Sequence, residues 1–309
     1  MEYIKGFTFG WGAKQGDFKK SEAKESLRLM KERTASNYVI FALAAKQETA
    51  FSTDVIYEGE HIVSDDELRE MIDYAREIDL KIMLKPTVNP SDGTWRAHIN
   101  FFDLDVPCEP KWKDWFASYT AYQMHYAKIA EEKQVEMFIA GCEMVQTERR
   151  EREWRQLIND LRTVYNGLIT YNTDKYQEAN VKWWDAVDVI SSSGYYPLGD
   201  WDNQLDRIET IIKPYNKPFF FAEAGCPSRA GSSQIPNAWT LEGAVDLEEQ
   251  KRFYEDMLER TSKRSWVKGF GLWDWKAVLY PEEEAHLDKD YAVFGKPAEE
   301  TIRAFYEKK

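Results

Sequence analysis

Two glutamates, Glu143 and Glu223, each end a short apolar run of the chain. The runs are Met-Phe-Ile-Ala-Gly-Cys at 137–142 and Pro-Phe-Phe-Phe-Ala at 218–222. Apolar runs of this length are typical of strands buried in a parallel sheet. If both strands line one barrel, their carboxylates can meet at its open end. Two facing carboxylates are the minimal apparatus for cleaving a glycosidic bond, so the pair predicts that chemistry.

The elements that must position these residues alternate along the chain. Strand-like runs cover residues 4–10, 38–45, 81–88, 136–144, 168–173, 187–194, 218–224 and 267–275. Helical apolar spacing covers 19–32, 65–78, 112–132, 153–166, 203–213, 247–262 and 298–306, and the link 176–185 is predicted to be a short helix. The segment 64–67, Ser-Asp-Asp-Glu, marks one helix start by its capping residues.

Eight strands that alternate with helices predict a parallel sheet with right-handed crossovers, and eight units are the number that closes a barrel. The predicted fold class is therefore α/β, with residues 1–309 forming a single (β/α)8 TIM barrel. A doubly wound open sheet is the alternative, but no GxGxxG motif follows any of the strands.

Barrels of this kind place their chemistry at the carboxyl ends of the strands. Amide, lysine and aromatic side chains stand at those ends here. The apolar face of a sugar ring packs on an indole while its hydroxyls reach polar neighbours, and the chain holds twelve Trp. Candidate substrate-binding residues are Trp11, Lys85, Asn89, Asn172, Tyr195, Tyr196, Trp273 and Trp275. The set predicts a sugar site rather than a phosphate or metal site.

The aromatic candidates differ in what they are expected to do. Strand alternation sends Trp273 and Trp275 to one face, so both are expected at the barrel mouth. Either Tyr195 or Tyr196 is expected to hydrogen-bond Glu223, and Tyr195 is the preferred one. The other tyrosine is then a packing residue.

The two glutamates need opposite protonation states. Strands 4 and 7 of an eight-strand barrel face each other, and hydrolysis with retention needs carboxyl groups about 5–5.5 Å apart. Glu223 must be ionised to attack the anomeric carbon, whereas Glu143 must carry a proton for the leaving oxygen. Each negative charge raises the pKa of its neighbour, which favours this division. The alternative is that each glutamate forms an ion pair with a nearby Lys or Arg.

Glutamates at the ends of strands 4 and 7 of a barrel resemble those of clan A glycoside hydrolases. Within that clan the chain resembles glycoside hydrolase family 113, the β-1,4-mannanases. The resemblance implies Glu143 as acid/base, Glu223 as nucleophile, retention of configuration, and β-mannan or manno-oligosaccharides as substrate. The segments that carry it are Phe-Thr-Phe-Gly-Trp at 7–11, Ala-Gly-Cys-Glu-Met at 140–144, Ser-Gly-Tyr-Tyr-Pro at 193–197, Phe-Ala-Glu-Ala-Gly at 221–225 and Gly-Leu-Trp-Asp-Trp at 271–275.

One position departs from the clan pattern. Many clan A enzymes have Asn directly before the acid/base, where it contacts the sugar 2-hydroxyl, but this chain has Cys142. A thiol is a weak donor, so another side chain must make that contact. Lys85, Asn89 and Asn172 are the candidates, and the choice between mannose and glucose stays open.

Other functions compete with that of an endo-acting mannanase. An exo-β-mannosidase or another β-1,4-glycanase could use the same glutamates. A non-catalytic sugar-binding barrel would usually lack one of the carboxylates, and both are present. Lys85 could form a Schiff base as in barrel aldolases, but two nearby glutamates would keep it charged.

The bulk composition restricts partners and cofactors. The chain has 54 Asp and Glu against 41 Lys and Arg, a net charge of −13, which argues against nucleic acid. Three cysteines cannot all pair, four dispersed histidines form no zinc motif, and no apolar run reaches a membrane span. No metal or organic cofactor and no membrane is expected, and a monomer is expected. The chain begins with a strand and no secretion signal, so a cytoplasmic location is expected unless a leader was removed.

Overall fold

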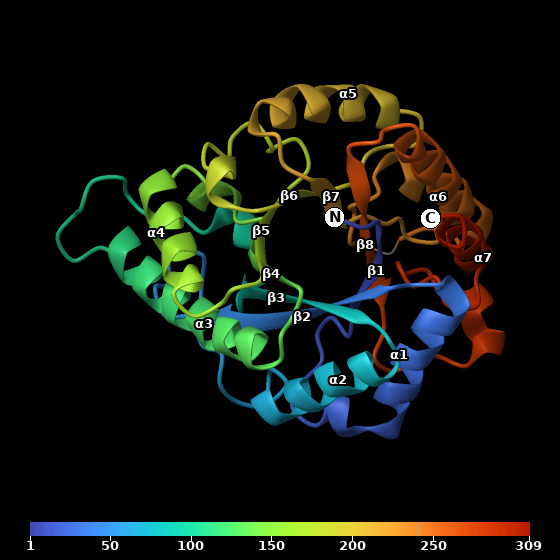
Figure 1. The fold of residues 1–309 in the computed structure, drawn as a ribbon, viewed down its shortest axis with the longest axis horizontal. Coiled ribbons are helices and arrows are strands. Elements are labelled where there is room, and N and C mark those ends of the chain that lie inside the picture. Colours follow the sequence, from blue (N-terminus) through green and yellow to red (C-terminus); the bar gives the residue numbers. More distant parts are fainter. Residues whose placement is uncertain (241) are drawn as a thin grey trace.

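Eight parallel strands close into a barrel in chain order, as the sequence predicts, in a computed structural model that describes residues 1–240 and 242–309. Figure 1 looks along the barrel and shows the strands around the centre with the helices outside them. This confirms the predicted fold class. The strands are β1 (Ile4–Phe9), β2 (Tyr38–Gln47), β3 (Lys81–Pro90), β4 (Met137–Cys142), β5 (Leu168–Thr173), β6 (Ile190–Ser193), β7 (Phe219–Glu223) and β8 (Val267–Trp275).

Helices follow the strands nearly where the apolar spacing places them. The α-helices are α1 (Ser21–Thr34), α2 (Asp65–Glu77), α3 (Trp112–Glu132), α4 (Glu151–Arg162), α5 (Trp201–Ile212), α6 (Leu247–Ser262) and α7 (Pro297–Tyr306). At the start of α2, Ser64 and Glu67 form the reciprocal capping box that the sequence indicates. Among the described residues, no helix combines the length and apolar composition that a bilayer crossing needs.

The predicted short helix at 176–185 is wrong. The link consists of turns and ends in the 3-10 turn η4 (Trp184–Ala186). Tyr176 has a left-handed backbone, with φ 66°, which a right-handed helix excludes. Trp183 and Trp184 are both fully buried, and their indoles donate to the main-chain oxygens of Glu148 and Glu178. Anchoring two adjacent indoles in the core therefore outweighs the helical apolar spacing.

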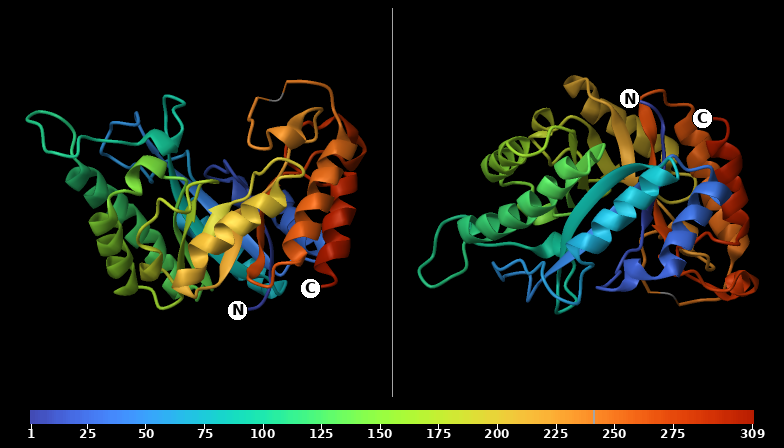
Figure 2. Two further views of the ribbon diagram at one scale, coloured as in Figure 1. Left: turned by 90° about the horizontal axis from the view of Figure 1, so that it is seen from above. Right: turned by 60° about the horizontal axis from the view of Figure 1, so that its bottom comes forward.

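The core has two layers. A small cluster inside the barrel includes Ile40, Met137 and Phe220, and a much larger one lies between the sheet and the helices. Because the interior is filled, the barrel is not a pore, and a ligand site must lie at an end of it. Figure 2, left, shows the long loops after β3 and β7 rising at the end opposite both chain termini.

Two strands that end at the site carry an extra residue close to their carboxyl ends. In the β4–β5 pair, Ile139 and Cys142 are three residues apart on β4, but their partners on β5 are two apart. In the β6–β7 pair, Ser192 and Ser193 are adjacent on β6, but their partners on β7, Phe221 and Glu223, are two residues apart. An inserted residue interrupts the inward–outward alternation and re-aims the side chains that follow. Both irregularities turn side chains toward the barrel mouth.

Gly269 in β8 is expected to be indispensable for closing the barrel. Its φ is +121°, and a Cβ there would lie 2.0 Å from the carbonyl oxygen of Ile4 on β1. We expect Gly269→Ala to lower the free energy of unfolding by roughly 2–5 kcal/mol through clash and backbone strain. Gly12→Ala is the control, because Gly12 has φ +78° but no atom within 4 Å of its Cβ position. Urea unfolding of both variants would measure the two changes in the free energy of unfolding. Equal decreases in Gly269→Ala and Gly12→Ala would contradict the predicted clash.

Candidate active site

A cavity of about 590 Å³ opens at the carboxyl ends of the strands and contains both predicted glutamates. Carboxylate oxygens of Glu143 and Glu223 and the Sγ of Cys142 all lie within 4.8 Å of one another. Residues 80 positions apart in the chain therefore face each other across one cavity. Its other lining residues are Asn89, Pro90, Gly93, Thr94, Trp95, Asp174, Tyr195, Asn237 and Trp239.

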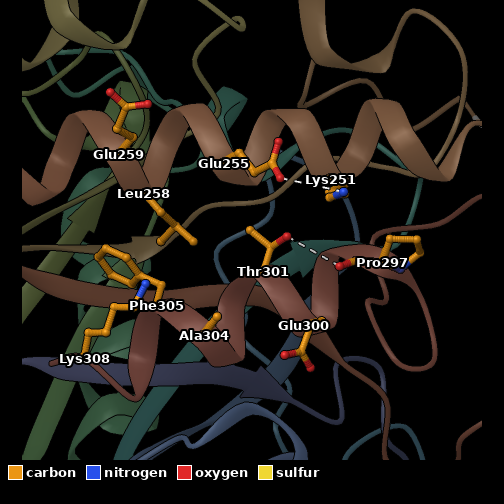
Figure 3. A pocket seen from close by; sticks show the side chains of 10 residues that line it. All are labelled: Lys251, Glu255, Leu258, Glu259, Pro297, Glu300, Thr301, Ala304, Phe305 and Lys308. Carbon is orange, nitrogen blue, oxygen red and sulfur yellow. Dashed lines mark hydrogen bonds and ion pairs between the residues drawn. The ribbon is translucent and has the colours of Figure 1, made fainter.

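A hollow of similar volume, about 630 Å³, lies outside the barrel between α6 and α7 (Figure 3). Its charged side chains include Lys251 and Glu255, which form a loose ion pair at 3.8 Å along α6. The side chains around it belong to the outer surfaces of two packed helices. They supply no facing pair of buried carboxylates, so the chemistry belongs to the cavity at the barrel mouth.

Glu223, the last residue of β7, is surrounded by hydrogen-bond donors. Its Oε1 accepts from Lys85 Nζ at 2.5 Å and from Cys142 Sγ at 3.2 Å, and its Oε2 accepts from the Tyr195 hydroxyl at 3.0 Å. Burial alone would raise the pKa of Glu223, but the charges of Lys85 and Arg96 outweigh it and hold the pKa below its usual range. Glu223 is therefore ionised at neutral pH.

Glu143 directly follows β4 and has the opposite electrostatics. Its Oε1 accepts from the Ser193 hydroxyl at 2.8 Å, and its Oε2 accepts from Arg96 at 3.0 Å. Burial raises the pKa of Glu143, the charge of Glu223 raises it further, and Arg96 offsets part of the rise. The site thus holds one carboxylate that favours ionisation beside one that favours its proton.

Arg96 fixes the geometry on the Glu143 side. Its Nε donates to the Cys142 carbonyl at 2.8 Å, and its Nη1 donates to Asn89 Oδ1 at 3.0 Å. Sequence reasoning missed Arg96, which lies in the loop after β3 within the 3-10 turn η2 (Arg96–His98). No strand end or periodic pattern marks this position, so one sequence offers no signal for it.

Aromatic side chains form one wall beside the glutamates. Trp11 and Trp273 pack edge to face with ring centres 5.1 Å apart, and Trp239 packs on Trp273 at 5.8 Å. Lys85 Nζ lies 5.3 Å from the Trp273 ring. The predicted residues Trp11, Lys85 and Trp273 therefore gather near the carboxylates.

Trp275 is not where the sequence predicts it, whereas Tyr196 has the packing role expected of the tyrosine that does not bond Glu223, since Tyr195 makes that bond. Trp275 lies beneath α1, where its indole donates to the hydroxyl of Ser26 at 3.0 Å. The expected alternation is broken because β8 has an extra residue between the partners of Phe7 and Phe9, so Trp275 turns outward. Tyr196 is fully buried, and its hydroxyl donates to Glu178 at 2.7 Å rather than to a group at the site.

The amide candidates divide between the cavity and the layer behind it. Asn89 lines the cavity, with its Oδ1 occupied by Arg96. Asn172 is fully buried, and its side-chain amide donates to Ser193 Oγ at 3.0 Å. Asn172 therefore supports the hydroxyl that contacts Glu143 and does not itself face the cavity.

Several cavity residues were absent from the predicted set. Asp174 stands directly after β5, and burial together with the charge of Glu143 raises its pKa to about 7. Its position at a strand end was a usable signal. Asn237 and Trp239 come from the long loop after β7, where no periodic pattern guides a prediction. Ser193 ends β6, and the sequence motif at 193–197 does not single out its hydroxyl.

The cluster of Cys142, Glu143 and Glu223 has ligand types that metals use. Its oxygens already accept from Lys85 and Arg96, and burial raises the pKa of the Cys142 thiol well above its usual range. A metal would have to displace both cations and ionise that thiol. The donor set therefore fits carboxylate chemistry better than metal binding.

Two comparisons with known proteins point to the same family. The family "Glycoside Hydrolase Family 113" matches residues 7–296. Two solved structures of a GH113 β-1,4-mannanase, one of them a complex, are 65% and 64% identical to the chain, with a TM-score of 0.99 and full coverage of both chains. The GH113 β-mannanase AaManA from Alicyclobacillus acidocaldarius, in complex with ManMIm, is 41% identical with a TM-score of 0.96, covering 100% of this chain and 98% of that one. The comparison with curated proteins gave no match.

Replacing Lys85 by Met is expected to raise the pKa of Glu223. The lysine cation favours the ionised carboxylate, so its removal leaves burial to favour the protonated form. A ¹³C NMR titration of glutamate-labelled protein would follow the Glu223 carboxyl, assigned by its loss in Glu223→Gln. Lys296→Met is the control, because Lys296 is also a buried lysine but pairs with Asp288. An equal Glu223 pKa in the two variants would contradict the proposed coupling.

Proposed function

The chain belongs to Glycoside Hydrolase Family 113, and we propose that it cleaves β-1,4-mannan and manno-oligosaccharides internally, by double displacement with retention. The family resemblance inferred from the sequence is confirmed. The observation that carries the proposal is the facing pair Glu143 and Glu223, with oxygens within 4.8 Å and pKa values shifted in opposite directions. This proximity fits the close carboxyl spacing of retaining enzymes, about 5–5.5 Å.

In the first step, Glu223 attacks the anomeric carbon of the mannosyl unit. The bond from that carbon to the linking oxygen breaks, and the proton on Glu143 passes to this oxygen, which leaves as a hydroxyl of the departing chain. Lys85 and Tyr195 hold the two oxygens of Glu223, so its attack needs little reorientation. The product of the step is a covalent glycosyl–enzyme ester.

In the second step, Glu143 changes from acid to base. The ester removes the negative charge of Glu223, so the pKa of Glu143 falls and its carboxylate becomes the base. Glu143 takes a proton from water, the water oxygen bonds to the anomeric carbon, and the bond to Glu223 breaks. Both glutamates then return to their starting protonation states.

Asn89 is the best placed of the candidates for contacting the sugar 2-hydroxyl. It lines the cavity, whereas Lys85 is fully buried against Glu223 and Thr8, and Asn172 lies behind Ser193. The Oδ1 of Asn89 accepts from Arg96 at 3.0 Å, and its side-chain amide keeps two N–H donors. These donors can meet the hydroxyl next to the reacting carbon, which replaces the contact that Cys142 cannot supply well.

Internal cleavage requires sugar platforms on both sides of the glutamates. Trp95 comes from the loop after β3 and Trp239 from the loop after β7, and both line the cavity while 42% and 59% of their surfaces are exposed. Exposed indoles on loops from opposite sides of the barrel can each carry a sugar ring. This arrangement supports an endo-acting enzyme over an exo-β-mannosidase.

A panel of mannan, glucomannan, xylan and cellulose oligomers tests the proposed function. We expect kcat/KM on mannan oligomers to exceed that on xylan and cellulose oligomers by at least about 100-fold, since contacts to a sugar hydroxyl discriminate strongly. Mannohexaose should give oligosaccharides as first products. Comparable rates on cellulose would overturn the mannan assignment, and mannose as the first and sole product would overturn internal cleavage.

The two glutamates should fail in different ways when replaced by alanine. Glu223→Ala should lower kcat by about 10⁴-fold or more, and azide should restore a slow reaction that yields an inverted product. Glu143→Ala should lose far more activity on mannan than on an aryl β-mannoside, whose activated leaving group needs no proton. Glu32→Ala, on the exposed side of α1, is the control. Equal loss on both substrates for Glu143→Ala would argue against its acid role.

A further inference from the structure

A second hollow lies at the same end of the barrel as the active cavity. Its volume is about 350 Å³, at the small end of the range for ligand sites, about 300–1,000 Å³. The loops after the adjacent strands β2 and β3 form it. The latter loop projects from the upper end of the barrel in Figure 2, left. Its lining residues are Phe51, Asn100, Phe101, Phe102, Glu109 and Pro110.

We propose that this hollow is a second binding site for the mannan chain, outside the catalytic cavity. The proposal rests on the proposed function, since it names a further contact of the same polymeric substrate. A polymer longer than the active cavity can touch the enzyme at a distance from the bond that is cleaved. Binding there would hold the chain without taking part in the chemistry.

Two aromatic rings give the hollow its apolar surface. Phe51 is 64% exposed and Phe102 is 60% exposed. A single exposed apolar side chain needs no explanation, but two large rings beside one hollow mark a binding surface. The apolar face of a sugar ring can cover such rings while its hydroxyls stay in contact with water or polar neighbours.

Polar groups stand beside these rings. Asn100 Oδ1 accepts from Arg149 at 2.6 Å, and the Asn100 main-chain N–H donates to Ala50, which fixes the residue. Within the described residues its side-chain amide has no acceptor, so two N–H donors are free for hydroxyls. Glu109 adds carboxylate acceptors at the same hollow. Donors and acceptors beside aromatic faces are the combination that sugars need.

The hollow and the active cavity share one loop. One segment, residues 91–111, contributes Thr94 and Trp95 to the cavity and Phe102 to the hollow. This segment is fastened to the β2 side by a main-chain hydrogen bond from Ser91 to Gln47 at 2.7 Å. A chain that left the cavity past Trp95 and followed this loop would meet the hollow.

Charge favours a neutral ligand over an anionic one. The nearby cations are already engaged: Arg149 pairs with Asp103 at 3.1 Å, and Lys111 pairs with Asp105 at 3.8 Å. The hollow itself contributes the acid Glu109 and no lysine or arginine. An unsubstituted mannan chain carries no charge, so it meets no repulsion from Glu109.

The test compares binding of the polymer with and without the two rings. Glu223→Gln serves as an inactive background so that mannan is not degraded. We expect the added pair Phe51→Ala and Phe102→Ala to weaken retardation in gels that contain soluble mannan, with Kd rising about tenfold, which corresponds to about 1.4 kcal/mol. Ile235→Ala with Leu287→Ala is the matched control, because both side chains are 61% exposed and lie outside the hollow.

The outcomes separate the possibilities. Unchanged mannan binding by the Phe51 and Phe102 variant, or an equal loss in the control, overturns the second site. Sedimentation that finds a dimer which this variant alone dissociates would assign the hollow to a second copy of the chain instead. The single variants Phe51→Ala and Phe102→Ala, with melting temperatures, show whether folding is intact. If the unmodified enzyme hydrolyses no mannan, the proposed function fails, whereas hydrolysis with unchanged binding rejects only the second site.

Discussion

The buried ion pair between Lys85 and Glu223 is the interaction on which the site depends. A carboxylate enclosed by protein would take up a proton unless a cation held its charge. Lys85 on β3 supplies that cation at 2.5 Å, and the negative charge so retained raises the pKa of Glu143. Lys85 thereby influences both protonation states, with Arg96 as the second cation that acts on the two carboxyl groups. Removing one partner of such a pair leaves an uncompensated buried charge, which lowers the free energy of unfolding by about 3–5 kcal/mol.

The barrel is what keeps this pair dry and aligned. Lys85 lies inside β3 and Glu223 ends β7, so closure of the sheet alone brings the two together. Side chains such as Met137 and Phe220 fill the barrel below them and exclude water from beneath the site. Catalytic geometry is therefore a property of the closed sheet, whereas loops contribute the aromatic platforms above it.

The sequence predicts the fold and the two glutamates because both depend on local patterns. Strands and helices differ in apolar period, and Glu143 and Glu223 each end an apolar run. Arg96 is invisible to such reasoning, because its role comes from a loop that folds back over β4. Trp275 was misplaced because an extra residue in β8 breaks the alternation on which that prediction depends. Irregular backbone thus limits single-sequence reasoning at the positions where function concentrates.

The backbone of Glu143 has a consequence of its own. Its φ of 52° lies in the left-handed region, where a residue with a Cβ has a backbone strain energy of roughly 1–3 kcal/mol. Glycine would adopt this conformation without strain. The backbone conformation at position 143 therefore disfavours the side chain that carries the carboxylate the reaction requires. The enzyme therefore gives up some conformational stability at one peptide unit in order to keep a carboxylate there, and the bonds from Ser193 and Arg96 are what hold that carboxylate in place.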